Sequence, residues 1–331
     1  MFEVVKYRAE LKEDWDRFVD VAKNASFLLK RDYMDYHADR FEDASVLVFQ
    51  AGKLIALLPA NLRESGLVGS HDGLTYGGFV FAKEIKLPVA LAAIAAILEF
   101  YHASGTHTLE LKVIPKFYHT HPSDEVDYAM FLCGAELFRR DTAFVVDQTA
   151  RIKYSGNYRR EANKARKDGD VVQEESDLGA FWNEVLRPNL NARFGVEPVH
   201  TLEEMQQLQS CFPDHIKCYT VRNNAGEMLC GSIFYLYGNV AHSQYIASSD
   251  LGRKSGALNL LFIELLDRVL SAYKIFDFGI ANENQGRVLN AGLASWKERM
   301  GGRTVVHDFY RIQTNRWKTI ENVSLVRQDG V

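Results

Sequence analysis

The chain has 331 residues, of which 47% are hydrophobic and 25% charged, and a formal net charge of −4. Since a single hydrophobic core rarely grows beyond roughly 250–300 residues, this length predicts two domains. The composition excludes a disordered or fibrous protein. The negative net charge argues against binding nucleic acid over the whole surface, although a local basic patch could still bind phosphate. We expect no DNA partner.

Cysteine spacing and hydropathy narrow the class further. The four cysteines form no CxxC pair and lie in apolar stretches, which predicts buried reduced thiols and neither a disulfide framework nor a metal site. The N-terminus lacks the basic and apolar regions of a signal peptide, and the most apolar run, residues 87–100, is shorter than a bilayer span. We therefore expect a cytoplasmic protein with no integral membrane segment.

One order of elements is predicted twice along the chain. Alternation and helical periodicity in the first half predict three strands, a helix and a strand, over 45–50, 54–62, 73–81, 87–105 and 107–115. The second half repeats this order over 217–222, 228–238, 239–249, 257–274 and 275–282. Gly52 and Gly226 occupy equivalent turns. The order predicts an α/β (α+β) fold, in which each half is a mixed, mostly antiparallel sheet flanked by helices.

Further helices are predicted before each set of strands. They cover residues 14–25 in the first half and 177–194 and 201–212 in the second. A charged helix over 158–169 follows residues 143–156, where the first set of elements closes. We therefore predict domains at 1–148 and 149–331.

Several segments resemble the Fem-like proteins and their acetyltransferase-type bacterial relatives. In the first half these are NASFLLKRDYMDYHADRFED, LLPAN and SHDGLTYGGF; in the second they are YRREANKARKDG, EPVHTLEEM, HSQYIASS and FDFGIANENQGRVLNAGLASWKERMGGR. The resemblance covers nearly the whole chain. It implies two tandem GNAT-like units and an acyl-type transfer to an amine, from an acyl-CoA such as acetyl-CoA or from an aminoacyl-tRNA. The chain has no stretch like the long coiled-coil arm of some Fem transferases.

The second unit contains a candidate phosphate-binding loop, SSDLGRKSGALNLL, between a predicted strand and a predicted helix. Backbone N–H groups at a helix N-terminus bind anions, and glycines allow a phosphate to come close. The GNAT pattern R/Q-x-x-G-x-G/A is met only in part, because Leu258 replaces the last small residue. A solvated basic turn capped by Ser255 is the alternative. The predicted donor-binding residues are Arg253, Lys254, Ser255, Gly256 and Ala257.

Three residues on adjacent predicted strands are candidates for catalysis. Alternation places His242 and Gln244 on one face and Ser243 and Tyr245 on the other. An imidazole can accept a proton at neutral pH, so His242 is a candidate base. Tyr245 could protonate a leaving thiolate or hold the substrate, and Asp277, beside Gly279, could hold the acceptor amine or act as a base. For each residue, an ordinary structural hydrogen bond is the alternative.

Other polar residues are candidates for contacts with the substrate. A helix is predicted over 286–300, with an apolar stripe of Leu289, Leu293, Trp296 and Met300 and a polar stripe beside it. The basic helix over 158–169 could dock a phosphate-bearing partner, tRNA included, or could be a solvated face. The predicted substrate-binding residues are Gln244, Asn282, Asn290, Lys297, His71, Tyr76, Arg159 and Lys164.

The sequence therefore predicts an N-acyltransferase whose C-terminal unit carries the donor site. The resemblance implies an acyl-CoA donor and an acceptor amine on a cell-envelope or polysaccharide precursor. Two alternatives stay open: an aminoacyl-tRNA-dependent Fem-type aminoacyltransferase, and a non-catalytic ligand-binding module with a degenerate GNAT fold.

Overall fold

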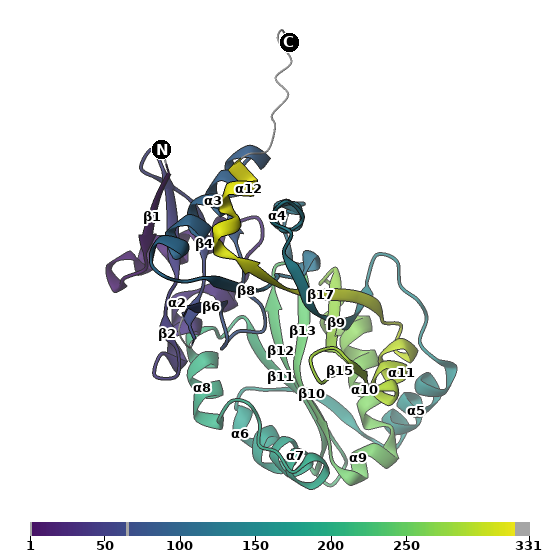
Figure 1. Cartoon of the computed structure of the whole chain (residues 1–331). Coiled ribbons are helices and arrows are strands. Elements are labelled where there is room, and N and C mark those ends of the chain that lie inside the picture. Colours follow the sequence, from purple (N-terminus) through teal and green to yellow (C-terminus); the bar gives the residue numbers. More distant parts are fainter. Residues whose placement is uncertain (1, 64–65, 322–331) are drawn as a thin grey trace. The chain divides into compact units, whose positions relative to one another are not determined.

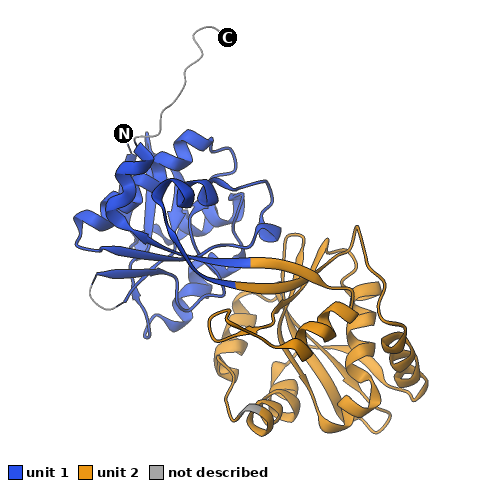
Figure 2. Ribbon diagram, turned by 45° about the vertical axis from the view of Figure 1, so that its right-hand side comes forward, with its two compact units in different colours: residues 1–140, 307–331 blue, residues 141–306 orange. Residues whose placement is uncertain are grey.

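The computed structural model describes residues 2–63 and 66–321. Its contacts divide the chain into two compact units, residues 1–140 with 307–331 and residues 141–306 (Figure 2). The strands β9 (Glu136–Asp147) and β17 (Arg303–Gln313) each begin in one unit and end in the other. Residues from 307 belong to the first unit because β17 pairs with β8 (Thr108–Lys112) and α12 (Trp317–Glu321) packs on α3 (Leu87–Ala103). The predicted domains, 1–148 and 149–331, differ from these units, because the prediction places residues from 307 in the second domain.

The first unit holds two groups of strands (Figure 1). One is an antiparallel sheet in the order β1 (Phe2–Lys6), β3 (Val46–Gln50), β4 (Lys53–Leu58) and β7 (Val80–Phe81). The other runs in the order β17, β8, β6 (Leu67–Ser70), β5 (Asn61–Leu62) and β2 (Glu42–Asp43), with β6 and β8 parallel. The longer helices are α1 (Lys12–Val21), α3 and α4 (Glu125–Cys133). Short helical turns are η1 (Ala9–Leu11), η2 (Phe27–Leu29), α2 (Arg31–Met34), η3 (Asp35–His37), η4 (Lys116–Tyr118) and η7 (Thr314–Arg316).

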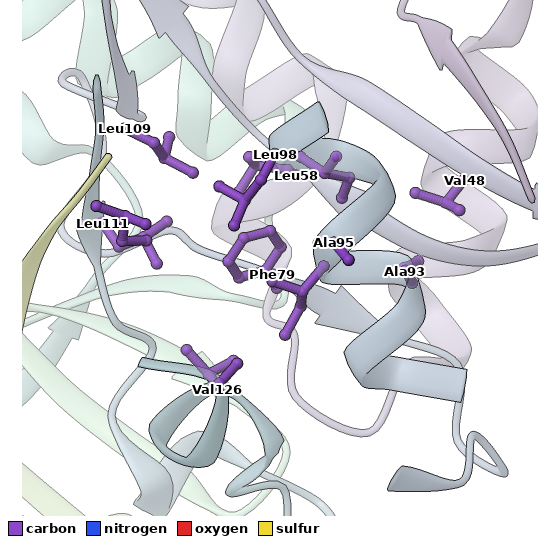
Figure 3. Close-up of a cluster of buried hydrophobic side chains, with 14 of the residues drawn as sticks. Val48, Leu58, Phe79, Ala93, Ala95, Leu98, Leu109, Leu111 and Val126 are labelled. Atoms are coloured by element: carbon purple, nitrogen blue, oxygen red, sulfur yellow. The ribbon is translucent and has the colours of Figure 1, made fainter. Parts of the chain in front are cut away.

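Helix α3 forms the centre of the core of the first unit. It is rich in alanine and leucine and carries Pro88 in its first turn, where proline fits a helix. Figure 3 shows Ala93, Ala95 and Leu98 of α3 among Phe79 and other buried apolar side chains. A helix buried on most sides needs no polar face, which explains its uniformly apolar sequence.

The predicted strand over 73–81 is wrong for most of its length. Only Val80 and Phe81 are strand, and the strand that runs parallel to β8 is β6, which the sequence analysis did not predict. Residues 73–79 form a tight loop against β6 because of their glycines. A Cβ on Gly77 would lie 1.9 Å from the carbonyl oxygen of Ser70, and Gly78 has a φ of +106°.

The main sheet of the second unit has the order β10 (Val171–Glu175), β11 (Ile216–Arg222), β12 (Met228–Tyr237), β13 (Val240–Ser248), β14 (Ile275–Ile280) and the end of β9. All neighbours are antiparallel except β13 and β14. Helices cover both faces (Figure 1). They are α5 (Gly156–Lys167), α6 (Leu178–Phe181), the π-helical η5 (Trp182–Leu186), α7 (Arg187–Phe194), α8 (Leu202–Cys211), α9 (Asp250–Ser255), α10 (Ala257–Glu264), the π-helical η6 (Leu265–Val269) and α11 (Ala291–Arg299).

Aromatic rings connect α10 to the sheet in the second unit. The ring centroid of Phe262 on α10 lies 5.9 Å from that of Phe276 and 5.3 Å from that of Phe278, both on β14. Trp296 of α11 lies 5.2 Å away on another side of the same ring. Because side chains alternate along a strand, burying Phe276 and Phe278 against α10 turns Asp277 to the opposite face of the sheet.

Candidate active site

The two parallel strands of the second unit separate at a pair of candidate residues. β13 and β14 pair only from Val240 beside Ile275 to His242 beside Asp277, although β13 continues to Ser248. Beyond this point the facing edges of the two strands no longer satisfy each other's hydrogen bonds. His242 and Asp277 therefore lie where the sheet opens and where a ligand can take the place of a strand.

His242 and Asp277 form a buried hydrogen-bonded pair. The His242 Nδ1 lies 2.7 Å from Asp277 Oδ2, and Asp277 Oδ1 accepts a hydrogen bond from the Gly279 N–H at 2.7 Å. On the other side of the ring, Nε2 lies 3.1 Å from Oε1 of Gln244. A carboxylate accepts, so Nδ1 carries the hydrogen and a neutral His242 keeps its lone pair on Nε2. In that tautomer the Gln244 amide turns to offer its N–H group.

The predicted alternation along β13 is wrong because the strand contains a β-bulge. Ile233 pairs with Tyr245 while the next residue, Phe234, pairs with Ser243, so Gln244 is an extra residue without a partner on β12. Tyr235 pairs with His242. Since Ile233 and Tyr235 lie two residues apart on β12, their partners Tyr245 and His242 share one face of the sheet.

Tyr245 is held by a histidine that the sequence analysis did not select. Its hydroxyl lies 2.6 Å from Nδ1 of His200 and accepts from the His200 backbone N–H at 3.3 Å, and its ring lies edge-on to Trp182. Burial raises the pKa of Tyr245 to about 12. A phenol with so high a pKa stays protonated, which suits a hydrogen-bonding role. No sequence signal could have linked His200 to Tyr245, because only the fold brings them together.

Lys297 is buried beside the same opening. Its ammonium donates to the carbonyl oxygens of Gly279 at 2.9 Å and Ile280 at 2.7 Å. Burial lowers the pKa of Lys297 to about 8, although the nearby charge of Asp277 raises it. Gly279, with a φ of +71°, places backbone without a side chain next to His242. A Cβ on Gly279 would lie 3.5 Å from Cε1 of His242. Lys297 thus fixes the end of β14 next to the His242–Asp277 pair.

Asn282 and Asn290 serve the local structure. Asn282 Oδ1 accepts from the backbone N–H and the hydroxyl of Thr142, at 2.6 and 2.7 Å. Asn290 caps α11 by accepting from the Leu293 N–H, so the predicted helix over 286–300 begins too early. The preceding residues form a small hairpin of β15 (Asn282–Glu283) and β16 (Val288–Leu289). Leu289, which the sequence analysis placed on the apolar stripe, is exposed there.

The predicted phosphate loop is largely helical. Residues 250–255 form α9, capped by Ser249, and Gly256, with a φ of +81°, separates α9 from α10. Arg253 donates to the Ser248 carbonyl and pairs with Asp250. Ser255 Oγ accepts from the Ala257 N–H at 3.2 Å, while the Lys254 side chain is exposed.

Helix α5 packs directly on this predicted donor site. A Cβ on Gly256 would lie 2.9 Å from the Cβ of Glu161, and the Glu161 carboxylate accepts from Asn259 at 2.5 Å. Glu161 therefore occupies one approach to the N-terminus of α10. Arg159 and Lys164, on other positions of the same helix, are exposed and available to a partner.

The candidate residues of the first unit, His71 and Tyr76, are buried. Tyr76 is 2% exposed and its hydroxyl donates to Ser26, which leaves it almost no surface for a substrate. His71 is also buried, with its ring stacked 5.5 Å from that of His37. The Lys112 ammonium donates to the carbonyl oxygens of His71, Asp72 and Leu74, at 3.0 to 3.3 Å.

The buried histidines predict acid sensitivity. Burial lowers the pKa of His71 to about 3, and burial also lowers that of His37. Because unfolded histidine takes up a proton below its ordinary pKa near 6.5 and folded His71 does not, stability is lost as the pH falls from 6.5 towards 3. We expect the Tm of His71→Phe to fall less between pH 7.5 and 5 than that of the wild type. Replacing the exposed His121 by Gln should leave the wild-type pH dependence; an equal fall in all three proteins would contradict the prediction.

Neither a metal-binding cluster nor a membrane-spanning helix is found in residues 2–63 and 66–321. Across these residues, no group of three or more His, Cys, Asp or Glu side chains could hold a metal ion. None of the helices there is long and apolar enough to cross a bilayer.

The comparisons with known proteins define the class. Residues 153–303, which include the opening between β13 and β14, match the family model described as an acetyltransferase (GNAT) domain. One similar solved structure is that of FemX, with 12% identity and a TM-score of 0.65 over 95% of this chain and 98% of that one. L-PGS from Bacillus licheniformis has 15% identity and a TM-score of 0.60 over 94% and 93%.

A tandem GNAT protein from the clavulanic acid biosynthesis pathway is also similar, with 12% identity and a TM-score of 0.50 over 95% of this chain and 99% of that one. No curated protein matches by sequence. The chain thus has the tandem GNAT fold that the resemblance of its sequence implies. The family match supports acyl transfer as the general activity of this part of the chain.

Proposed function

We propose that the chain is a cytoplasmic N-acyltransferase that moves an acyl group from acyl-CoA to an amine of a cell-envelope or polysaccharide precursor. The observation that carries the proposal is the His242–Asp277 pair at the point where β13 and β14 separate. The match of this part of the chain to a GNAT acetyltransferase domain supports the thioester donor. The precursor as acceptor rests on the Fem-like resemblance.

The proposed reaction places the donor carbonyl between the separated strands. The acceptor nitrogen attacks the carbonyl carbon, His242 Nε2 takes a proton from that nitrogen, and the C–S bond then breaks and releases a thiolate that is protonated. Asp277 holds the Nδ1 hydrogen and stabilises the imidazolium that forms. Backbone N–H groups of β13 beyond His242 are the proposed donors to the carbonyl oxygen. Gln244, half-buried and next to Nε2, orients the incoming amine.

Tyr245 and Lys297 have supporting roles in this proposal. The hydroxyl of Tyr245 is bonded to His200, so we propose that it contacts the acceptor and leave the protonation of the thiolate to solvent or to the imidazolium. Lys297 uses two of its three N–H donors on the backbone of β14 and is 2% exposed, so we propose that it positions the end of this strand and does not contact the substrate.

A thermal-shift titration with CoA, acetyl-CoA and tRNA tests the donor. A ligand that binds only the folded chain raises its Tm, and we expect CoA and acetyl-CoA to raise it by about 5 °C at a hundredfold excess over Kd. Replacing both Arg253 and Lys254 by Ala should reduce this shift, while replacing the exposed Arg17 and Lys53 of the first unit should not. A CoA response unaffected by the first pair would exclude these side chains as donor contacts.

Two other outcomes would favour the alternatives. Stabilisation by tRNA alone would support the aminoacyl-tRNA-dependent reaction, for which the exposed Arg159 and Lys164 of α5 are the candidate phosphate contacts. An unchanged Tm with CoA, acetyl-CoA and tRNA would support a non-catalytic ligand-binding module, which the packing of Glu161 on Gly256 favours.

A further inference from the structure

A second hollow of the second unit is not used by the proposed reaction. This pocket, of about 390 Å³, is lined by the π-helical turn and α7, by the loop that follows α7, and by the start of α8. Trp182, Pro198 and Leu202 give it apolar wall, and His200, which is 7% exposed, links it to Tyr245. The π-turn at Trp182 and the bulge before Tyr245 are both local irregularities of the kind that re-aim side chains towards functional sites.

The charges that line the pocket leave one carboxylate without an ion-pair partner among the described residues. Arg187 pairs with Oε2 of Glu197 at 3.0 Å, and Oε1 of Glu197 accepts from Asn191 at 3.1 Å, so these two opposite charges neutralise each other. Glu203 is exposed and has no ion-pair partner within residues 2–63 and 66–321. A positively charged ligand therefore gains an ion pair here without breaking one.

The N-terminus of α8, which also lines the pocket, does not favour an anion. A capping box already closes it: Thr201 Oγ1 accepts from the Glu204 N–H at 3.1 Å, and the Glu204 carboxylate accepts from the Thr201 N–H at 2.8 Å. Two glutamates in this first turn neutralise the positive end of the helix dipole. The preference of the pocket is thus for a cation with an apolar stem.

The pocket lies near the proposed base. His200 bonds to Tyr245, and Tyr245 and His242 pair with residues two apart on β12, so they share a face about 7 Å apart along the sheet. We propose that the pocket binds an ammonium group of the acceptor, and that the acceptor is an aliphatic compound with two amines: one held near Glu203, the other presented to His242. Only the role of His242 rests on the proposed function.

Calorimetric titration of the full chain without any acyl donor tests this proposal. The three probes are 1,5-diaminopentane, 1-pentanol and pentanoate, which share a five-carbon chain and differ in charge. At low salt we expect the diamine to bind about five-fold more tightly than 1-pentanol, as an exposed ion pair allows, and the anionic pentanoate to bind most weakly. Glu203→Gln should remove the advantage of the diamine.

Glu13→Gln is the matched control. Glu13 is the second residue of α1, as Glu203 is of α8. It is also exposed to solvent, where Arg17 lies 3.9 Å from its carboxylate, so its replacement should leave the diamine preference unchanged. Equal binding of the three probes, tighter binding of pentanoate, no binding of any probe, or a diamine preference that survives Glu203→Gln would each overturn the proposal. Selective diamine binding by a chain whose Tm does not respond to CoA would support the amine-binding pocket and contradict the proposed transfer reaction.

Discussion

Replacing Asp277 by asparagine is expected to lower kcat of acyl transfer about a thousand-fold while leaving the fold intact. The amide is isosteric with the carboxylate, and its oxygen can still accept from the Gly279 N–H. Its N–H group, however, donates to His242 Nδ1 and forces the ring hydrogen onto Nε2. The imidazole then has no lone pair to take the proton of the acceptor amine.

Asp147→Asn is the control for this prediction. Asp147 ends β9 in the second unit, where one of its carboxylate oxygens accepts from the backbone and hydroxyl of Thr149, and an asparagine oxygen can replace it. We expect kcat and Tm close to wild type for this variant. Steady-state kinetics that show less than a ten-fold loss for Asp277→Asn would exclude His242 as the base.

Replacing Phe262 by alanine is expected to give the largest loss of stability, about 3–5 kcal/mol of the free energy of unfolding. Its ring is fully buried and contacts Phe234, Phe276 and Phe278 of the sheet as well as Trp296 of α11. The truncation leaves a cavity at the place where α10 and α11 meet β14. Because β14 carries Asp277 and α11 carries Lys297, activity should fall together with stability.

Urea denaturation followed by fluorescence measures this loss. Phe262→Leu keeps most of the buried volume and should cost about 1–2 kcal/mol, which separates the effect of the cavity from that of the aromatic ring. A loss below about 1 kcal/mol for Phe262→Ala would mean that α10 does not depend on this ring.

The sequence was informative wherever one element repeats a simple period. The strand over 217–222, the strand over 228–238 and the helix over 87–105 lie close to their predicted positions, because each is a mostly apolar run that is buried along most of its length. Periodicity fails where the chain departs from a regular period. The extra residue Gln244 moved Tyr245 to the face of His242, and the capping of α11 by Asn290 shortened a predicted helix.

The environment of a candidate residue was harder to predict than its position. His242 and Asp277 were selected on separate strands, but their hydrogen bond depends on the register of β13 and β14. The packing of Glu161 on Gly256 joins residues 95 positions apart, and local sequence carries no signal for such a contact. The same holds for the burial of Tyr76, whose glycine-rich loop looked open in the sequence.

The return of the chain to the first unit through β17 and α12 has a consequence for biosynthesis. The first 140 residues emerge from the ribosome long before residues 307–321 are made. Until then β8 lacks its partner strand β17, and α3 lacks the helix α12 that packs on it. The first unit to emerge is thus the last to be completed, and its apolar edge stays uncovered while the second unit is being translated. A premature stop near residue 300 should therefore destabilise the N-terminal unit, although residue 300 itself lies in the second unit.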